Sequence, residues 1–552
     1  MGYPILQLPS QLEEMMVSAG RVLVFVLLGL APTGCAADPD TASDTLPIPA
    51  SEKCENLQHS WKKPHTRLEA ARMLPADVTT GAPQICEVAG RISPNETSTI
   101  GVVYRFPVEW NHKIVGLGGG GFAGNVRLDA ALPALIKGYA TMQTDTGHAA
   151  TEPWNTAWAV EEDGSPNVEG LIDFGYRAVH EMTVLGKDLA ETYYGQLPAK
   201  SYFQGCSQGG RQGMVAAQKY PQDFDGIIAG APAFNDVARV SMSLISRAFL
   251  AENAKLSVPQ IQLVNSAALA ACDGEDGAVD GIISMPDACS WDPQELLCAG
   301  GVSGDDCLSP AQVAAVQSAY SDKRDMNGKI VAYGLARGSE LSSFPWFMAL
   351  DQDSQLETGY YNFASAAGFP TDTDFSTNDV IASHAAQKDS LFDRIYTADN
   401  PDLSEFVKEE GKLLLWHGLY DQLLPPEPLI DYYQEALEVT DQRLLAKSSS
   451  RKAEESVQLF TAIGVSHCLG GAGPSTFDGL AVIDAWVESG EKPVRIVASQ
   501  PPPAMAALAR ALMGELPRLT PDSMTRPLCP WPQLPRYDGE GSLEIAANFV
   551  CR

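Results

Sequence analysis

The stretch Ser201–Gly210, SYFQGCSQGG, constrains the fold of this chain more than any other segment. A short β-prone run leads into its glycines, and Arg211–Tyr220 after it has the pattern of a helix. A strand, a sharp turn and a helix in this order form a nucleophile elbow, where the strained turn needs small neighbours. G-x-S-x-G also occurs by chance in a chain with 48 glycines, so the strand before it and the helix after it are needed to support a catalytic role. We predict that Ser207 is a nucleophile.

Strand and helix patterns alternate along the chain on both sides of this turn. Val168–Tyr194, just before the elbow strand, carries apolar residues at helical spacing and predicts a long helix. Such alternation predicts an α/β fold with a mainly parallel sheet. The predicted strands are Ile100–Phe106, Lys113–Leu117, Gly138–Thr144, Gly226–Gly230, Lys412–Trp416 and Val457–Ile463, the last of which we expect to end the core sheet.

The pattern changes in residues 236–410, which are helical, irregular and rich in aromatic side chains. We expect an inserted lid domain that shapes a substrate pocket; the alternative is an ordinary second domain with these aromatics in its core. Residues 37–235 and 411–552 would then form the two parts of the main core. The aromatic residues in question are Phe344, Trp346, Phe347, Tyr360, Tyr361 and Phe363.

The amino-terminal residues indicate export. Arg21 precedes the apolar run Val22–Ala31, which is too short to span a bilayer and is followed by small residues. We predict a signal peptide over residues 1–36, hence a secreted or periplasmic protein without a transmembrane segment. Cys35 offers the alternative of a lipid anchor, although Pro32 stands where such signals usually carry an aliphatic residue.

The charge of the chain narrows the choice of partners. The 552 residues include 38 Lys and Arg against 69 Asp and Glu, a formal net charge of −31. This balance argues against nucleic acid or an anionic membrane surface, because both repel an acidic protein. A small-molecule substrate is the more compatible partner.

Asp421 and His467 each lie just past the end of a predicted strand. The chain order Ser207, Asp421, His467 is the order of catalytic residues in the α/β-hydrolase fold. We therefore predict Ser207 as nucleophile, His467 as base and Asp421 as the acid that orients the base. His417 precedes the acid, so we expect it to line the pocket rather than to act as base. His148 is expected to be structural.

A glycine run, Gly118–Gly124, follows the predicted strand Lys113–Leu117. Directly after a core strand, such a run leaves backbone N–H groups free to face a substrate oxyanion. The alternative is a plain flexible turn. A nucleotide-phosphate loop is disfavoured because no G-K-[ST] follows. His180, within the long helix pattern, is interpreted as a helix-face residue.

Ten cysteines remain after Cys35, an even number that suits an oxidising compartment. Cys206 precedes the predicted nucleophile and Cys468 follows the predicted base, so a bridge between them would hold the two in register. The alternative is two buried free thiols, since connectivity does not follow from sequence. Sequence proximity suggests four further pairs: Cys54–Cys86, Cys272–Cys289, Cys298–Cys307 and Cys529–Cys551.

The segment between Cys272 and Cys289 alternates carboxylates with glycines. Asp273, Asp276 and Asp280 offer hard oxygen ligands on a tightly curved backbone, which favours a Ca²⁺ loop. It is not an EF-hand, because the terminal bidentate Glu and the EF-hand spacing are missing. The alternative is an acidic surface turn.

Taken together, these motifs resemble the tannase and feruloyl esterase family of α/β-hydrolases. The resemblance covers nearly the whole mature chain and is weakest over Gln500–Ser523, which we interpret as an insertion or linker. The motifs that carry it are GCSQGG at 205–210, GGGGFAG at 118–124, DFGYRAVHEMT at 173–183, CDGEDGAVDGIISMPDAC at 272–289, HGLYD at 417–421, HCLGGAGP at 467–474 and RPLCPWPQ at 526–533.

The resemblance implies an α/β-hydrolase fold with a large inserted lid, the catalytic residues Ser207, Asp421 and His467, and a Cys206–Cys468 bridge. It also implies a structural Ca²⁺ in the lid and no organic cofactor. The implied metal ligands are the side chains of Asp273, Asp276 and Asp280 and the carbonyls of Ala278 and Ile282.

We therefore expect a secreted serine esterase that acts on a small aromatic ester, or on an ester derived from a plant polymer, of an acid such as ferulate or gallate. The oxyanion donors would be the backbone N–H groups of Gln208 and of Gly120 or Gly121. The same family includes a hydrolase of mono-hydroxyethyl terephthalate, so terephthalate-type monoesters are an alternative. A further alternative is a surface binding protein that keeps the fold without the chemistry.

Overall fold

A computed structural model of the chain describes residues 49–552, except 125, 153–154, 237–239, 242–244, 246–247, 250, 301–303, 326, 342–345, 347–389 and 504–522. The predicted signal peptide with Cys35 therefore lies outside the described residues. So do Phe344, Phe347, Tyr360, Tyr361 and Phe363, together with most of Gln500–Ser523. None of the helices described is long and apolar enough to cross a membrane.

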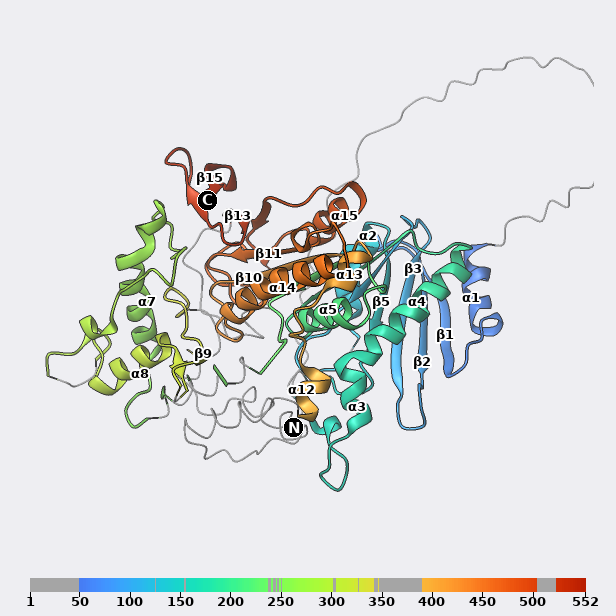
Figure 1. Ribbon diagram of the computed structural model, residues 1–552, viewed down its shortest axis with the longest axis horizontal. Coiled ribbons are helices and arrows are strands. Elements are labelled where there is room, and N and C mark those ends of the chain that lie inside the picture. Colours follow the sequence, from blue (N-terminus) through green and yellow to red (C-terminus); the bar gives the residue numbers. More distant parts are fainter. Residues whose placement is uncertain are drawn as a thin grey trace, which may run out of the picture. The chain divides into compact units, whose positions relative to one another are not determined.

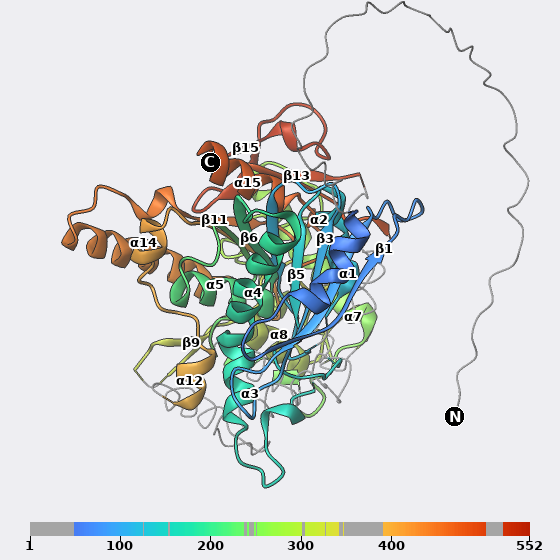
Figure 2. The ribbon, with the colours of Figure 1, turned by 90° about the vertical axis from the view of Figure 1, so that its right-hand side faces the viewer.

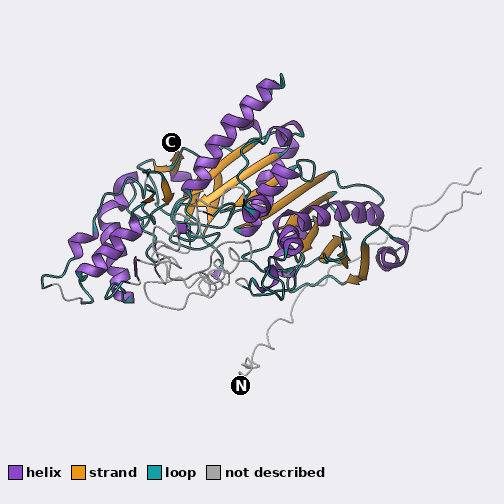
Figure 3. Ribbon diagram, turned by 60° about the horizontal axis from the view of Figure 1, so that its bottom comes forward, coloured by secondary structure: helices purple, strands orange, loops and turns teal. Residues whose placement is uncertain are grey.

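One large sheet organises the described chain, with eleven strands in the order β1-β2-β3-β5-β4-β6-β7-β10-β11-β13-β12 (Figure 3). The central strands from β5 to β11 pair in parallel, and antiparallel strands extend the sheet at both edges. The strands are β1 Thr66–Leu74, β2 Ile85–Ile92, β3 Ile100–Pro107, β4 Lys113–Leu117, β5 Ala140–Thr144, β6 Lys200–Cys206, β7 Gly226–Gly230, β10 Lys412–Gly418, β11 Val457–Ala462, β12 Ile496–Ser499 and β13 Thr525–Pro530.

All the strands predicted from sequence are present within about two residues of the predicted bounds. The prediction that Val457–Ile463 ends the sheet is wrong, because β13 pairs with β11 and β12 pairs with β13. The edge strand β1 is half exposed along its length, so the alternation of apolar and polar residues that marks a strand is missing from it. Two short ribbons, β8 Lys323–Arg324 with β9 Ile330–Ala332 and β14 Pro535–Tyr537 with β15 Phe549–Cys551, complete the described strands.

Helices cover both faces of the sheet because buried side chains alternate between the faces along each strand. One core cluster joins the strands to α1, α4, α5, α13 and α14, and a second joins them to α2 and α15. Figure 1 shows α4, α5 and α14 across one face, and Figure 2 shows α5 and α14 to one side of β6. The bounds are α1 Ala50–Ser60, α2 Leu132–Ile136, α4 Ala178–Tyr194, α5 Gln208–Lys219, α13 Ser404–Lys408, α14 Glu427–Ala446 and α15 Gly479–Ser489.

The helix predicted over Val168–Tyr194 has an interruption. It consists of α3 (Val168–Ile172), a π-helical turn at Asp173–Arg177, and α4. Such turns are frequent at functional sites. We call Asp173–Arg177 the π turn.

The described part of 236–410 has a core of its own around α7 (Val258–Cys272) and α8 (Pro310–Tyr320). Trp346 is 1% exposed in this core and packs against Phe249 and Tyr320. For this side chain the alternative interpretation holds: it fills a core. The segment returns to the main sheet through α12 (Leu391–Tyr396). The domain boundaries drawn from sequence stay predictions.

All five disulfides expected from the sequence are formed, including Cys206–Cys468. The four pairs of near neighbours close loops of 9 to 32 residues. The fifth joins residues 262 positions apart.

Candidate active site

Ser207 occupies the sharp turn between β6 and α5. Its backbone has φ +60° and ψ −121°, a conformation that residues with a side chain rarely adopt. The turn is held in place because the Ser207 N–H donates to the Gly230 carbonyl at 2.9 Å, while its carbonyl accepts from Arg211 N and Ala233 N. This geometry is the elbow that the sequence predicts.

The glycines around the elbow are required by close backbone contact. A Cβ on Gly118 would lie 2.6 Å from the Cα of Gly209, far inside the normal contact distance. Gly205 is equally crowded, since its Cβ would meet the backbone of Gly209. The glycine run and the elbow therefore pack directly against each other.

Asp421 and His467 meet because β10 and β11 are paired in parallel, so their carboxyl ends lie side by side. Tyr420 N donates to the carbonyl of Val465 at 3.0 Å and joins the two following loops. The result is a hydrogen bond of 2.8 Å between His467 Nδ1 and Asp421 Oδ2. Both residues are buried, with 5% and 4% of their surface exposed.

The Asp421 carboxylate is surrounded by donors. Its Oδ1 accepts from the N–H groups of Leu423 (3.0 Å) and Leu424 (2.8 Å). Burial by itself would raise the pKa of this carboxyl, but His467 and His417 outweigh it and hold the pKa well below its ordinary value. Asp421 is therefore ionised wherever the protein is folded at neutral pH.

The disulfide between Cys206 and Cys468 fastens the elbow to the histidine loop. Each cysteine is the immediate neighbour of a predicted catalytic residue, Ser207 or His467. Because a disulfide keeps its two Cα atoms close, here 5.9 Å apart, neither loop can move without the other.

His417 contacts the acid, a role that the sequence did not reveal. Its Nε2 lies 3.1 Å from Asp421 Oδ2 and 2.8 Å from the carbonyl of Leu424. Both neighbours are acceptors, so Nε2 carries the proton and donates. His417 is 1% exposed, and its Nδ1 has no hydrogen-bond partner among the described residues. It lies next to the acid in a buried position, where we had expected a pocket wall.

The structure narrows the choice of oxyanion donors. Gly118 N donates to the Gln204 carbonyl and Gly119 N to the side-chain oxygen of Gln212 (3.1 Å). Within the described residues, the N–H groups of Gly120 and Gly121 have no acceptor. Gln208 is the first residue of α5, where helical N–H groups are unpaired. These three N–H groups match the predicted donors, whose role stays a prediction.

Comparison with known proteins agrees with this geometry. The family model for tannase and feruloyl esterase matches residues 86–552. The chain belongs to this family. A probable feruloyl esterase from Arthroderma benhamiae is 32% identical over 487 residues, 85% of each chain. A mono(2-hydroxyethyl) terephthalate hydrolase from Piscinibacter sakaiensis is 29% identical over 92% of each chain.

Solved structures of the family share the fold. The crystal structure of feruloyl esterase B from Aspergillus oryzae superposes with a TM-score of 0.75 at 26% identity, covering 91% of this chain and 100% of that one. The mixed, mostly parallel sheet is thus an α/β-hydrolase-like fold, and the chain is a carboxylic ester hydrolase. This argues against the alternative of a binding protein without chemistry.

His148, which lies beside the family's glycine run, is a packing residue. Its ring stacks on Trp158 with ring centres 4.0 Å apart, and Thr146 lies within 3.4 Å of its Nε2. Burial lowers the pKa of His148 to about 3, so its ring is neutral at physiological pH. The structural role predicted for it is confirmed.

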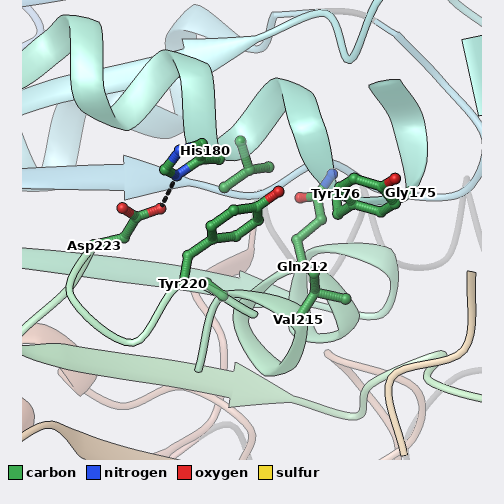
Figure 4. Close-up of a pocket in the computed structure, with 9 residues that line it drawn as sticks. Gly175, Tyr176, His180, Gln212, Val215, Tyr220 and Asp223 are labelled. Atoms are coloured by element: carbon green, nitrogen blue, oxygen red, sulfur yellow. Dashed lines mark hydrogen bonds and ion pairs between the residues drawn. The ribbon is translucent and has the colours of Figure 1, made fainter. Parts of the chain in front are cut away.

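A second His–Asp pair joins α4 to the loop that precedes β7. His180 Nδ1 of α4 lies 2.9 Å from Asp223 Oδ2, and its ring stacks on Tyr220 at 3.9 Å. Figure 4 shows the pair at one end of a small depression that reaches Gly175 and Gln212. Within the described residues, no serine or cysteine lines this depression, so the pair has no nucleophile to serve.

The acidic loop of the insertion holds two buried carboxylates. Asp273 accepts from the N–H groups of residues 280–282, and Asp276 from Ala278 N and the Ser284 hydroxyl. Neither pairs with a cationic side chain among the described residues, and burial raises the pKa of Asp273. Asp280 forms a buried ion pair with Arg526, a partner not foreseen from the sequence.

The loop fits a hard cation in its chemistry. Ala278 and Ile282 are 1% and 0% exposed, and their carbonyls accept no hydrogen bond from the described residues. Buried carbonyls without donors and carboxylates without cations are both costly, and a Ca²⁺ ion removes both costs. Among the described residues, no three His, Cys, Asp or Glu side chains converge as a metal cluster.

Proposed function

We propose that the chain is an exported serine esterase that hydrolyses esters of aromatic carboxylic acids, such as ferulate or gallate, through an acyl-enzyme. The buried His467–Asp421 hydrogen bond, tethered by the Cys206–Cys468 bridge to the elbow of Ser207, supports it most directly. Relatives named feruloyl esterase support the substrate class. The five disulfides support an oxidising, extracellular location.

In the first half of the reaction, Ser207 Oγ attacks the ester carbonyl carbon while His467 accepts its proton. Asp421 stays ionised and stabilises the imidazolium. The negative charge on the carbonyl oxygen is received by the N–H groups of Gln208 and of Gly120 or Gly121. The C–O bond then breaks, and His467 gives its proton to the leaving alcohol oxygen.

In the second half, water replaces the alcohol. His467 takes a proton from the water as its oxygen attacks the acyl carbon, and the same donors receive the oxyanion. The bond to Ser207 Oγ breaks, His467 returns the proton to Oγ, and the carboxylic acid leaves. No organic cofactor takes part in these steps.

Monoesters of terephthalic acid are a second candidate substrate. The match to the relative named mono(2-hydroxyethyl) terephthalate hydrolase covers 92% of this chain, against 85% for the probable feruloyl esterase. Ferulate, gallate and terephthalate esters share an aryl group bonded to, or conjugated with, the ester carbonyl. One catalytic centre therefore serves all three, and the rest of the pocket selects among them.

A substrate panel tests the proposal. Methyl ferulate, methyl gallate and mono(2-hydroxyethyl) terephthalate are offered to the oxidised protein and to Ser207→Ala, with fluorophosphonate labelling of both. Turnover of at least one ester and labelling of the native protein, both lost in Ser207→Ala, are expected. Labelling without turnover would reject the substrate class, and absence of labelling would reject Ser207 as the nucleophile.

We also propose that the acidic loop binds a structural Ca²⁺ through Asp273, Asp276 and Asp280 and the carbonyls of Ala278 and Ile282. A ligand present at 100 times its dissociation constant stabilises a fold by about 2.7 kcal/mol. For a chain of this size that corresponds to roughly 3 °C in melting temperature. Chelation should lower the melting temperature of the native protein and leave Asp276→Asn unchanged; equal shifts in both, or none, would reject the site.

A further inference from the structure

Arg211, in the first turn of α5, is buried without an ion pair. It is 0% exposed, and no carboxylate among the described residues contacts it. Its guanidinium donates instead to three backbone carbonyls, those of Phe174 (3.0 Å), Gly175 (2.9 Å) and Tyr396 (2.8 Å). A buried cation paired only with neutral groups is costly, so a function other than stability is the natural explanation.

The acceptors of Arg211 belong to two elements that are distant in sequence. Phe174 and Gly175 lie in the π turn, and Tyr396 ends α12, where the inserted segment returns to the core. Figure 1 shows α12 beside α3, which leads into the π turn. Gly175 permits this approach, because a Cβ there would lie 2.7 Å from Ile395 Cγ2. Arg211 therefore joins three elements at one point.

One series of contacts connects Arg211 to Gln208. The guanidinium of Arg211 lies 4.4 Å from the ring centre of Tyr396, which fixes that side chain by a cation–π contact. The Tyr396 hydroxyl then donates to Gln208 Oε1 at 3.1 Å. Gln208 is 2% exposed and directly follows Ser207, and its N–H is a proposed oxyanion donor.

A second series of contacts connects Arg211 to the glycine run Gly118–Gly124. Arg211 lies over the ring of Phe174, and Phe174 packs against Phe122, with ring centres 6.1 Å apart. Phe122 directly follows Gly120 and Gly121. Gln212, the next residue of α5 after Arg211, accepts a hydrogen bond from the N–H of Gly119. Both sources of oxyanion donors are thus held by the same turn of α5.

We propose that Arg211 and Tyr396 are positioning residues that hold the two halves of the oxyanion hole in register. The inference rests on the proposed function. Donors in such a site must sit at hydrogen-bond distance from the developing oxyanion, and displacements well below 1 Å weaken them. Loss of the network should therefore weaken transition-state binding and leave substrate binding unchanged, which is a fall in kcat at constant KM.

Tyr396→Phe is the decisive variant, and the chain offers a matched control. It removes only the hydroxyl that donates to Gln208, at the start of α5. Tyr432, which is as buried as Tyr396, lies near the other end of the same helix, where its hydroxyl accepts from Gln218 Nε2 at 3.0 Å and donates to the Asn400 carbonyl at 3.1 Å; Tyr432→Phe removes that hydroxyl. Losing an oxyanion donor outright costs about 10²–10³-fold in kcat, so displacing one should cost about 10-fold.

The expected result is a kcat about 10-fold lower in Tyr396→Phe, with KM within twofold, and unchanged kinetics in Tyr432→Phe. An arylboronic acid, which forms a tetrahedral adduct on the serine, should lose affinity in proportion to kcat, while the product acid binds as before. Arg211→Lys cannot make three bonds and the ring contact together, so its kcat should fall further. If it does not fold, Tyr396→Phe decides.

Unchanged kcat and boronate affinity in Tyr396→Phe, at a stability loss similar to that of Tyr432→Phe, would overturn the inference and leave the esterase in place. A parallel fall in both variants would also overturn it, because it would reveal a general effect of loosening α5. A native protein that neither labels with fluorophosphonate nor turns over ester would overturn the proposed function and this inference with it.

Discussion

The two His–Asp pairs on this sheet have the same chemistry and opposite surroundings. Asp421 follows β10 at the carboxyl end of the parallel strands, where α/β proteins place their ligands. Asp223 precedes β7, at the opposite end of the same sheet. The first pair is 0% and 5% exposed in its side chains and the second 9% and 31%. A His–Asp pair by itself therefore does not identify an active site. The position at the carboxyl end of the strands, the burial and the neighbouring elbow distinguish the Asp421 pair.

The largest expected difference between the pairs is in catalysis. Asp421→Asn should lower kcat about 10⁴-fold, because the amide can no longer hold His467 in the correct tautomer or stabilise its cation. The matched control, Asp223→Asn, breaks the other pair and should leave kcat within twofold. Ester turnover of both variants measures the contrast. Similar losses in the two would mean that the Asp421 pair is structural.

The second difference between the pairs is the Cys206–Cys468 bridge, which lies beside His467 and has no counterpart at His180 among the described residues. Removing the bridge with Cys206→Ala and Cys468→Ala together should lower kcat about 100-fold, since roughly 1 Å of misplacement can cost that much. The control is the double variant of Cys298 and Cys307, which removes a disulfide between residues 9 positions apart in the insertion. Its kcat should be unchanged. Equal activity of the two double variants would show that the bridge contributes to stability alone.

The second histidine on Asp421 gives a smaller effect. His417→Asn removes a donor from the carboxylate and should lower kcat about 10-fold, the value of one hydrogen bond to a charged group. The folded-state pKa of Asp421, now depressed below 3.8, should rise. A depressed pKa stabilises the fold above the unfolded value, and this stability disappears as pH falls through the folded value. On acidification, the variant should therefore begin to lose stability at a higher pH than the native protein. Superimposable acid unfolding curves of the two proteins would contradict the effect of His417 on the pKa of Asp421.

The smallest expected effect concerns the pair of His180 and Asp223. Burial would lower the pKa of His180, but Asp223 outweighs it and leaves the pKa raised above 6.5. The pair therefore stabilises the fold fully below pH 6.5, and this contribution is lost as pH rises through the raised pKa. Because His180 is about a third exposed, we expect less than about 1 kcal/mol. Native protein and Asp223→Asn should differ more in unfolding free energy at pH 5.5 than at pH 8.5; a constant difference would exclude the ion pair.

Much of this architecture was predictable because it is local in sequence. The central strands are short apolar runs that end in glycine or turn residues, and buried parallel strands carry that pattern strongly. The outer strands β1, β2, β12 and β13 were missed. The edge strands β1 and β12 are partly exposed, whereas β2 and β13 are mostly buried, so the four share no single pattern of burial. β13 also pairs with β11 and β12, which lie well before it in the chain.

The same division applies to the site. Ser207, Asp421 and His467 were predictable because each lies in the loop or turn that follows a strand, and the carboxyl ends of parallel strands meet at one edge of the sheet. His417 also lies at a strand end, but its contact with Asp421 depends on how the following loop folds back. Its position at the end of the strand, four residues before the acid, was enough to single it out and too little to assign its role.

The sequence by itself indicated the alternation of the central strands and helices, the elbow with its glycines, the proposed catalytic residues and, as a hypothesis, the five cysteine pairs that the structure contains. These depend on local backbone preferences and on chain order. Only the tertiary structure decided the π turn, the donors around Asp421, the Arg526–Asp280 ion pair and the contacts of Arg211. The Arg526–Asp280 ion pair and the contacts of Arg211 join segments far apart in the chain, and the donors around Asp421 depend on how its loop folds back. Their existence depends on which polar groups packing removes from water, and no local pattern records that.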